Sequence, residues 1–225
     1  MPTTPKDIFQ RIGLQIKGQV KWDTSIPLDK CGLYVIALTD VQDKMVCHNL
    51  PQFNNSAFDN WLSTVRAGDK QILVDNLTAN SQQIKNRLSK FWLSDETIVY
   101  IGKAGPTNSR TLRKRVDEYY ATKLGCDKKH AGGHWLNVLQ NVNQLTVFYC
   151  DYVDNDIEEK EEEMMSYFIE NVSASTKENL FDKVNCFPFA NKEIHRHSLK
   201  SKIKKKHGLN NQTVYCGRQW KKNGL

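Results

Sequence analysis

Two tyrosines, a lysine and an arginine stand close together near the middle of the chain, and together they could hold a phosphate group. Tyr100 and Lys103 lie in the run 96–105, and Arg115 and Tyr119 follow in 111–120. Charged nitrogens and hydroxyl groups are the side-chain donors that bind phosphate oxygens. Because a tyrosine in an apolar run is also common in a hydrophobic core, these residues alone do not fix the chemistry.

The local patterns predict the elements that would position these side chains. The run 96–105 is apolar and β-branched and closes on glycine, which favours a buried strand ending in a tight turn. In 111–120 the apolar residues recur at helical spacing. Arg115 and Tyr119 are four residues apart, so on a helix they share a face.

A carboxylate in the helix predicted over 156–172 is a candidate cation ligand. Five glutamates crowd its first turns, which is commonly compensation of the helix dipole. At 3.6 residues per turn, however, Glu161 lies within about 60° of the apolar residues Ile157, Met164, Met165, Phe168 and Val172. A carboxylate facing a core is costly unless it is paired or binds metal, so we expect Glu161 to do one or the other.

In order along the chain, these pieces form a family signature. Gly32-Leu33-Tyr34 precedes Tyr100-Ile101-Gly102-Lys103-Ala104, and then come Leu112-x-x-Arg115-x-x-x-Tyr119, the carboxylate helix and Pro188-Phe189-Ala190-Asn191. The ordered set resembles the GIY-YIG endonuclease superfamily. The resemblance covers 31–191 apart from an interval between the first two motifs.

The resemblance implies metal-assisted hydrolysis of a phosphodiester in double-stranded DNA. Mg²⁺ or Mn²⁺ on Glu161, together with Arg115, would neutralise the transition state. Tyr34 would accept the proton of the attacking water, and Lys103 would lower its pKa or hold it in place. Tyr100 and Tyr119 would position phosphate oxygens, and Asn191 would anchor the site or the phosphate. We expect all seven residues to be catalytic.

The implied fold class is α+β, with a small, mostly antiparallel three-stranded sheet flanked by helices. Two departures stand out: 65 residues lie between Tyr34 and Tyr100, and the connection 173–186 is long. We expect an N-terminal helical extension over 1–30, a nuclease-like domain over 31–191 with a helical insertion over 40–96, and a basic tail over 192–225. The insertion is either extra packing or a substrate clamp.

The charge of the chain is concentrated at its end. The net charge is +7, yet from residue 191 onward ten lysines and arginines stand against Glu193 alone. A basic segment with interleaved histidines and aromatics fits contact with a polyanion. We therefore expect Lys204, Lys205 and Lys206 to contact DNA, together with His130 and His134 in a loop that leaves backbone N–H groups open.

The Gly132-Gly133-His134-Trp135 stretch and the Pro-Phe-Ala-Asn ending look most like stand-alone, restriction-type members of the superfamily. That resemblance implies a defence role, a possible homodimer and a possible cognate methyltransferase. Two alternatives stay open: a repair-type nuclease directed to DNA structure or damage, and a non-catalytic DNA-binding protein on the same scaffold.

The six cysteines are scattered without a Cys-x-x-Cys pair, and we expect them to be free thiols. Cys126, His130 and His134 are spaced like zinc ligands, but the glycine pair between the histidines would break a helix presenting them. No apolar run is long enough for a membrane span or resembles a secretory signal, so a cytoplasmic location is expected.

Overall fold

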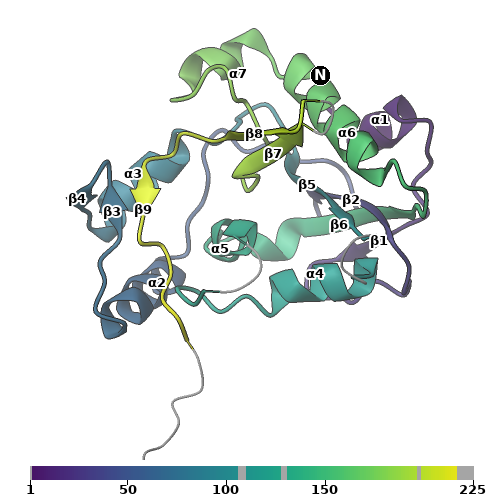
Figure 1. Ribbon diagram of the computed structural model, residues 1–225. Helices are drawn as coiled ribbons and strands as arrows, with labels where there is room; N and C mark the ends of the chain where they lie inside the picture. Colours follow the sequence, from purple (N-terminus) through teal and green to yellow (C-terminus); the bar gives the residue numbers. More distant parts are fainter. Residues whose placement is uncertain (1, 106–109, 128–130, 197–198, 217–225) are drawn as a thin grey trace, which may run out of the picture.

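The computed structural model has an α+β architecture with antiparallel sheets (Figure 1). It describes residues 2–105, 110–127, 131–196 and 199–216. The main sheet has four strands in the order β1-β6-β2-β5, and two small sheets have the orders β4-β3-β9 and β7-β8.

Seven α-helices, nine strands and one short 3₁₀ helix, η1, occur within the described residues. In chain order they are α1 (Pro5–Arg11), β1 (Gly18–Lys21), β2 (Gly32–Leu38), α2 (Asn55–Ala67), β3 (Leu73–Val74), β4 (Leu77–Thr78), α3 (Ser81–Ser89), β5 (Ile98–Ala104), α4 (Leu112–Tyr120), α5 (Ala131–Asn137), η1 (Val142–Gln144), β6 (Leu145–Asp151), α6 (Ile157–Asn171), α7 (Ala174–Asn179), β7 (Glu193–Arg196), β8 (Ser201–Lys204) and β9 (Leu209–Asn210).

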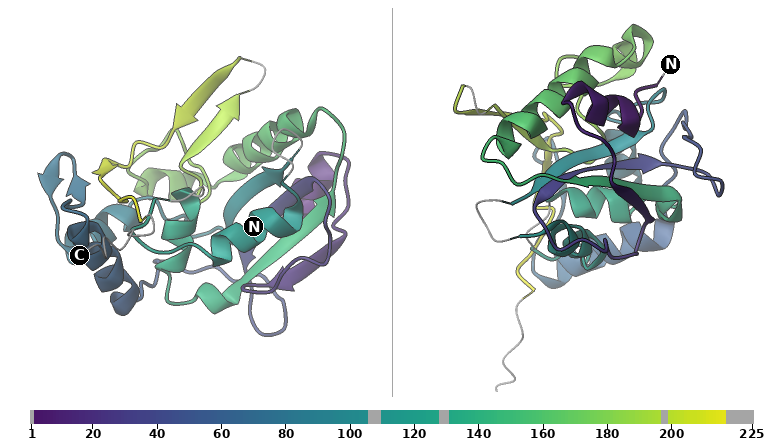
Figure 2. Two further views of the ribbon diagram at one scale, coloured as in Figure 1. Left: turned by 60° about the horizontal axis from the view of Figure 1, so that its bottom comes forward. Right: turned by 90° about the vertical axis from the view of Figure 1, so that its right-hand side faces the viewer.

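Strand β2 is the centre of the molecule, and every one of its residues is buried. Because side chains alternate along a strand, Tyr34 and Ile36 join one hydrophobic core, and Leu33 and Val35 join a second on the opposite face. Helices α2 to α5 supply the first core, and α1 and α6 the second. The right-hand view of Figure 2 shows the sheet between these helical layers.

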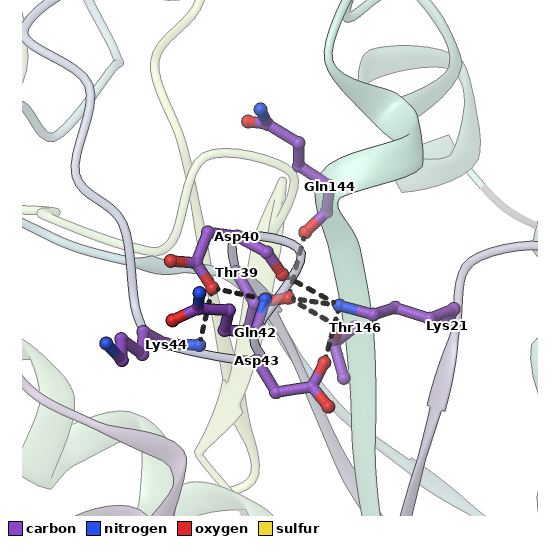
Figure 3. A network of polar contacts seen from close by, with 8 residues as sticks. All are labelled: Lys21, Thr39, Asp40, Gln42, Asp43, Lys44, Gln144 and Thr146. Atoms are coloured by element: carbon purple, nitrogen blue, oxygen red, sulfur yellow. Dashed lines mark hydrogen bonds and ion pairs between the residues drawn. The ribbon is translucent and has the colours of Figure 1, made fainter.

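The segment between β2 and β5 contains helices, as the spacing predicted. The two strands pair antiparallel with Tyr34 opposite Gly102, so the chain leaves the sheet after β2 and returns beside it. A polar network holds the turn through which the chain leaves β2 (Figure 3). Asp40 accepts hydrogen bonds from the backbone of Gln42 and Lys44, and the Lys21 side chain donates to Thr39.

The prediction of three strands in the main sheet was wrong, because β1 pairs with β6 as a fourth. This strand is four residues long, with Val20 opposite Val147. All four of its residues are partly or fully exposed. A short edge strand with a single apolar side chain gives no detectable alternation, which is why the pattern of 1–30 indicated a helix alone.

The described part of the basic segment after the β7–β8 hairpin is attached to other segments of the protein. Strand β9 pairs with β3 of the insertion, and the indole of Trp61 donates to the backbone of Gln212 at 2.7 Å. A disulfide joins Cys126 to Cys216. The expectation of six free thiols was therefore wrong, and Cys126 is not available as a zinc ligand.

Helix α5 begins at Ala131, so the glycine pair lies inside a helix. The prediction that it would break the helix was wrong, because contacts with neighbouring segments decide the outcome. A Cβ on Gly132 would approach the Ala190 carbonyl to 2.7 Å, and one on Gly133 would approach Thr122 to 2.4 Å. Among the described residues, no helix is long and apolar enough to cross a membrane.

Candidate active site

A cavity of about 360 Å³ opens where the free edge of β5 meets α4, α6 and β7. Five of the seven predicted catalytic residues line it: Tyr100, Lys103, Arg115, Glu161 and Asn191. The remaining lining residues are Ala104, Gly105, Arg110, Glu158, Glu162, Met165, Glu193, Ile194 and His195. Motifs that are far apart in the sequence therefore converge on one place.

Tyr34 and Tyr119 lie behind the cavity, in contact with Tyr100. Both are fully buried, and neither lines the cavity. The rings of Tyr34 and Tyr100 stack with centroids 5.8 Å apart, and Tyr119 meets Tyr100 edge-on at 5.2 Å. Gly102 makes room for this cluster, because a Cβ there would lie 2.6 Å from Tyr100 and 2.8 Å from the Tyr34 hydroxyl.

The pKa of Tyr34 does not fit the expected role of a phenol that is already ionised and can accept a proton from water. Burial raises the pKa of its phenol, and the charge of Arg115 and side-chain hydrogen bonds with Tyr119 and Arg115 offset that rise only in part. The hydroxyl groups of Tyr34 and Tyr119 lie 3.4 Å apart. Burial also holds the pKa of Tyr100 and Tyr119 well above the usual value, so all three phenols stay protonated at neutral pH.

Arg115 links the tyrosine cluster to the cavity. Its guanidinium bonds to Tyr34 and lies 3.5 Å from the carboxylate of Glu118, one turn further along α4. Burial by itself lowers the pKa of Arg115, but the facing tyrosines raise it overall, so the group stays charged. Helix α4 begins at an N-cap, Thr111, and buries Leu112 and Val116, which directs Arg115 toward the cavity.

Glu161 occupies the position that the helical wheel predicted. Its neighbours Met164, Met165 and Phe168 pack into the second core, and its carboxylate lines the cavity. Burial raises the pKa of Glu161 to about 7, against the opposing charges of Lys103 and Arg115. The backbone N–H of Lys103 donates a hydrogen bond to this carboxylate, which ties α6 to the edge of β5.

Lys103 does not lie beside Tyr34 as expected. In the paired strands it stands opposite Leu33, whereas Tyr34 stands opposite Gly102, so the two side chains emerge on opposite faces of the sheet. The Lys103 ammonium instead forms an ion pair with Glu158 at 2.5 Å. The group that acts on the phenol of Tyr34 is Arg115.

Asn191 completes the free edge of β5. Its side chain accepts a hydrogen bond from the backbone N–H of Ile101 at 3.0 Å and donates to the carbonyl of the same residue at 2.8 Å. Both polar atoms of this buried amide are thus engaged by the backbone. The geometry favours anchoring of the strand over direct contact with a phosphate.

The predicted DNA contacts divide into exposed and buried residues. Lys204 and Lys206 are exposed, whereas Lys205 and His134 are buried, so neither of these two is placed to contact DNA. The Lys205 ammonium donates to the carbonyls of Pro188 and Phe189, and His134 packs against the ring of Trp61. His130 lies outside the described residues.

Arg110, Glu158, Glu193 and His195 line the cavity but were not predicted to belong to the site. The sequence held a usable signal for Glu193 and His195. With Ile194 between them, polar and apolar residues alternate shortly after the Asn191 motif, as expected of a strand. Lys103, Arg110 and Arg115 face four carboxylates, counting Glu158, Glu161, Glu162 and Glu193. When all four are ionised, the carboxylates outnumber these cations by one, and because the pKa of Glu161 is about 7 this excess develops as the pH rises through neutrality.

This charge balance fits a divalent cation with oxygen ligands. A phosphodiester is also an anion, and these carboxylates would repel it unless a cation compensated their negative charge. Mg²⁺ and Mn²⁺ prefer carboxylate and water oxygens and need few protein ligands. Among the described residues no group of three or more His, Cys, Asp and Glu is arranged to enclose a metal, and a hydrated ion does not require one.

Comparisons with protein-family models, with curated proteins and with solved structures gave no match.

Proposed function

We propose that the chain is a metal-dependent endonuclease that hydrolyses phosphodiester bonds of double-stranded DNA. One observation carries the proposal: Arg115 and Glu161, taken from separate sequence motifs, line one cavity with Tyr100. A cationic donor, a neutral hydroxyl and a carboxylate around one hollow are the groups that metal-assisted phosphodiester hydrolysis requires. The motif order of the GIY-YIG superfamily supports the same reaction.

In this proposal Arg115 and Tyr100 bind the oxygens of the scissile phosphate. The Arg115 guanidinium keeps its charge, and the Tyr100 phenol keeps its proton, so both remain donors at neutral pH. Tyr34 and Tyr119 pack behind Tyr100 and hold it and Arg115 in place. They act as positioning residues.

Glu161 would hold Mg²⁺ or Mn²⁺, with Glu158 and Glu162 next to it in the cavity wall. Such a cation would stabilise the negative charge that develops on the phosphate oxygens in the transition state. Because burial raises the pKa of Glu161 to about 7, cation binding must displace a proton from a large fraction of molecules at neutral pH. The affinity for the cation should therefore rise with pH across this range.

A restriction-type role in defence is proposed from the motif resemblance in 132–135 and 188–191. A homodimer and a cognate methyltransferase belong to that proposal. Cleavage at discrete sites would support this assignment, whereas cleavage at branched or damaged DNA would favour the repair-type alternative.

The test is cleavage of unmethylated supercoiled plasmid in Mg²⁺, Mn²⁺ or EDTA. We expect metal-dependent cutting that Glu161→Ala slows by at least about 100-fold. Glu159→Ala is the matched control, because Glu159 is exposed on the same helix and does not line the cavity. An inactive wild type that still binds DNA, or a Glu161→Ala variant that cuts at the wild-type rate, would overturn the proposal.

A further inference from the structure

The two-stranded hairpin of β7 and β8 stands out from the body of the protein beside the candidate cavity. The left-hand view of Figure 2 shows it as the pair of yellow-green arrows projecting from the molecule, and the right-hand view agrees. Its strands pair Glu193 with Lys204 and His195 with Lys202. Glu193 and His195 also line the cavity, so the hairpin begins at the wall of the site.

Both ends of the hairpin are anchored in the interior. Before β7, the Asn191 side chain bonds to the backbone of Ile101. After β8, the buried Lys205 donates to the carbonyls of Pro188 and Phe189, and its backbone N–H donates to Lys192 at 2.8 Å. A hairpin whose two ends are fixed in this way keeps its direction relative to the cavity.

The two faces of the hairpin differ in character. Ile194 is buried and Ile203 packs beside it against the second core, so this face is attached to the protein near its base. The opposite face carries Glu193, His195, Lys202 and Lys204, whereas Arg196 alternates onto the same face as Ile194. The exposed cations of the hairpin are Arg196, Lys200, Lys202 and Lys204, and Glu193 at its base contacts Lys202 and His195 at 3.4 Å each.

We propose that this hairpin is a duplex-DNA arm that lies in the major groove next to the scissile phosphate. The inference rests on the proposed function and adds the means by which the duplex is held. The exposed cations match the phosphate backbone in charge, and a two-stranded β-ribbon fits the major groove of B-form DNA, which is about 12 Å wide.

The shape and the composition of the hairpin argue against binding to duplex RNA and to single-stranded nucleic acid. The major groove of duplex RNA is too deep and narrow to admit a ribbon. Proteins that bind single strands stack the bases on aromatic side chains. Within 193–196 and 199–204, the described part of the hairpin, no residue is aromatic apart from His195.

The test compares two triple variants of the full chain that remove the same charge. Arg196→Gln/Lys202→Gln/Lys204→Gln alters the hairpin. Lys6→Gln/Lys44→Gln/Lys70→Gln alters exposed lysines on other segments. Binding to one sequence as duplex DNA, duplex RNA and single-stranded DNA is measured by fluorescence anisotropy in EDTA over a range of KCl concentrations. Circular dichroism confirms that each variant is folded.

We expect the hairpin variant to bind duplex DNA about 10- to 100-fold more weakly at ~0.1 M salt, with a salt dependence reduced by about two to three ions. The control should lose less than about 3-fold, and binding to duplex RNA should change much less than binding to duplex DNA. An equal loss in the control variant, or an equal loss on duplex RNA, would overturn the proposed groove contact.

The outcome is separable from that of the proposed function, because binding in EDTA does not require cleavage. If the hairpin variant loses DNA binding while the wild type cuts nothing in Mg²⁺, the arm stands and the nuclease assignment fails. If the wild type cuts and the hairpin variant binds and cuts equally well, the nuclease assignment stands and the arm fails.

Discussion

At the scale of single residues, Glu161 shows a conflict between stability and function. It shares a stripe of α6 with Met164, Met165 and Phe168, which pack in the second core, whereas its own partly buried carboxylate lines the cavity. Burial, with a smaller contribution from the nearby Glu158, raises the pKa of its carboxyl to about 7 against the opposing charges of Lys103 and Arg115. Residues placed against the local packing preference are characteristic of functional sites.

This conflict gives a pH-dependent prediction for Glu161→Gln. Because the pKa of this acid is raised on folding, the protonated form stabilises the wild type fully below pH 4.5, and that contribution is lost as the pH rises through about 7. Glutamine remains neutral throughout. We expect the variant to be more stable than the wild type by about 2 kcal/mol at pH 8, after allowing for partial solvent screening, and about equally stable at pH 4.5.

Urea unfolding of both proteins at the two pH values measures this difference. Glu159→Gln is the control, since its side chain is exposed on the same helix, and it should keep the pH dependence of the wild type. A difference between Glu161→Gln and wild type that is the same at pH 4.5 and pH 8 would contradict the prediction.

At the scale of elements, the free edge of β5 is completed by a side chain in place of a strand. Asn191 satisfies both backbone groups of Ile101, and among the described residues no strand pairs with β5 on that side. Because Ile101 is fully buried, water cannot replace these hydrogen bonds. The amide thereby fixes the strand that carries Tyr100 and Lys103.

We therefore expect Asn191→Ala to lower the free energy of unfolding by about 2–4 kcal/mol, because it leaves a buried N–H and a buried carbonyl unpaired. Asn179→Ala is a matched control: Asn179 is exposed, and its side chain donates to the carbonyl of Ser175 at 3.0 Å. Removal of that hydrogen bond should cost less than about 0.5 kcal/mol. Equal urea midpoints for the two variants would rule out the anchoring role of Asn191.

The elements that carry the site were predictable where one strong local signal decided them. The buried run of β5 and the apolar stripe of α6 needed no tertiary information, and the wheel of α6 alone selected Glu161. The position of Lys103 relative to Tyr34 was not predictable, because it depends on the register of β2 against β5. The burial of Lys205 was equally hidden, because it depends on the carbonyls of 188–189, which accept hydrogen bonds from its side chain only in the folded protein.

At the scale of the whole molecule, the C-terminal segment connects parts of the chain that are distant in sequence. It contributes β7 to the cavity wall, β9 to the small sheet of the insertion, and Cys216 to the disulfide (Figure 1). The composition of 192–225 predicted a basic tail suited to contact with a polyanion, because lysine-rich sequence is normally exposed. The prediction did not include the contacts of this segment with other parts of the chain. The indole N–H groups of Trp61 and Trp135, for example, donate hydrogen bonds to Gln212.

The disulfide between Cys126 and Cys216 could not have been predicted from cysteine spacing. Ninety positions separate the two residues, and six cysteines can pair in many ways. In the structure Cys126 also forms a parallel bridge with Val214, which brings the two chain segments together. The remaining cysteines among the described residues, Cys31, Cys47, Cys150 and Cys186, are free.

The disulfide leads to a prediction about overall stability. Because it closes a loop of about 90 residues, it restricts the unfolded chain, and its removal should lower the free energy of unfolding by about 2–4 kcal/mol. Cys216→Ser should show this loss, and dithiothreitol should reduce the wild type to the same stability. Cys47→Ser, which alters an exposed free thiol, should behave as wild type with and without dithiothreitol. Thiol titration of the denatured, air-purified protein should find four reactive cysteines. Six reactive thiols, or a wild-type urea midpoint unchanged by the reductant, would show that the C-terminal segment is held by its hydrogen bonds and packing alone.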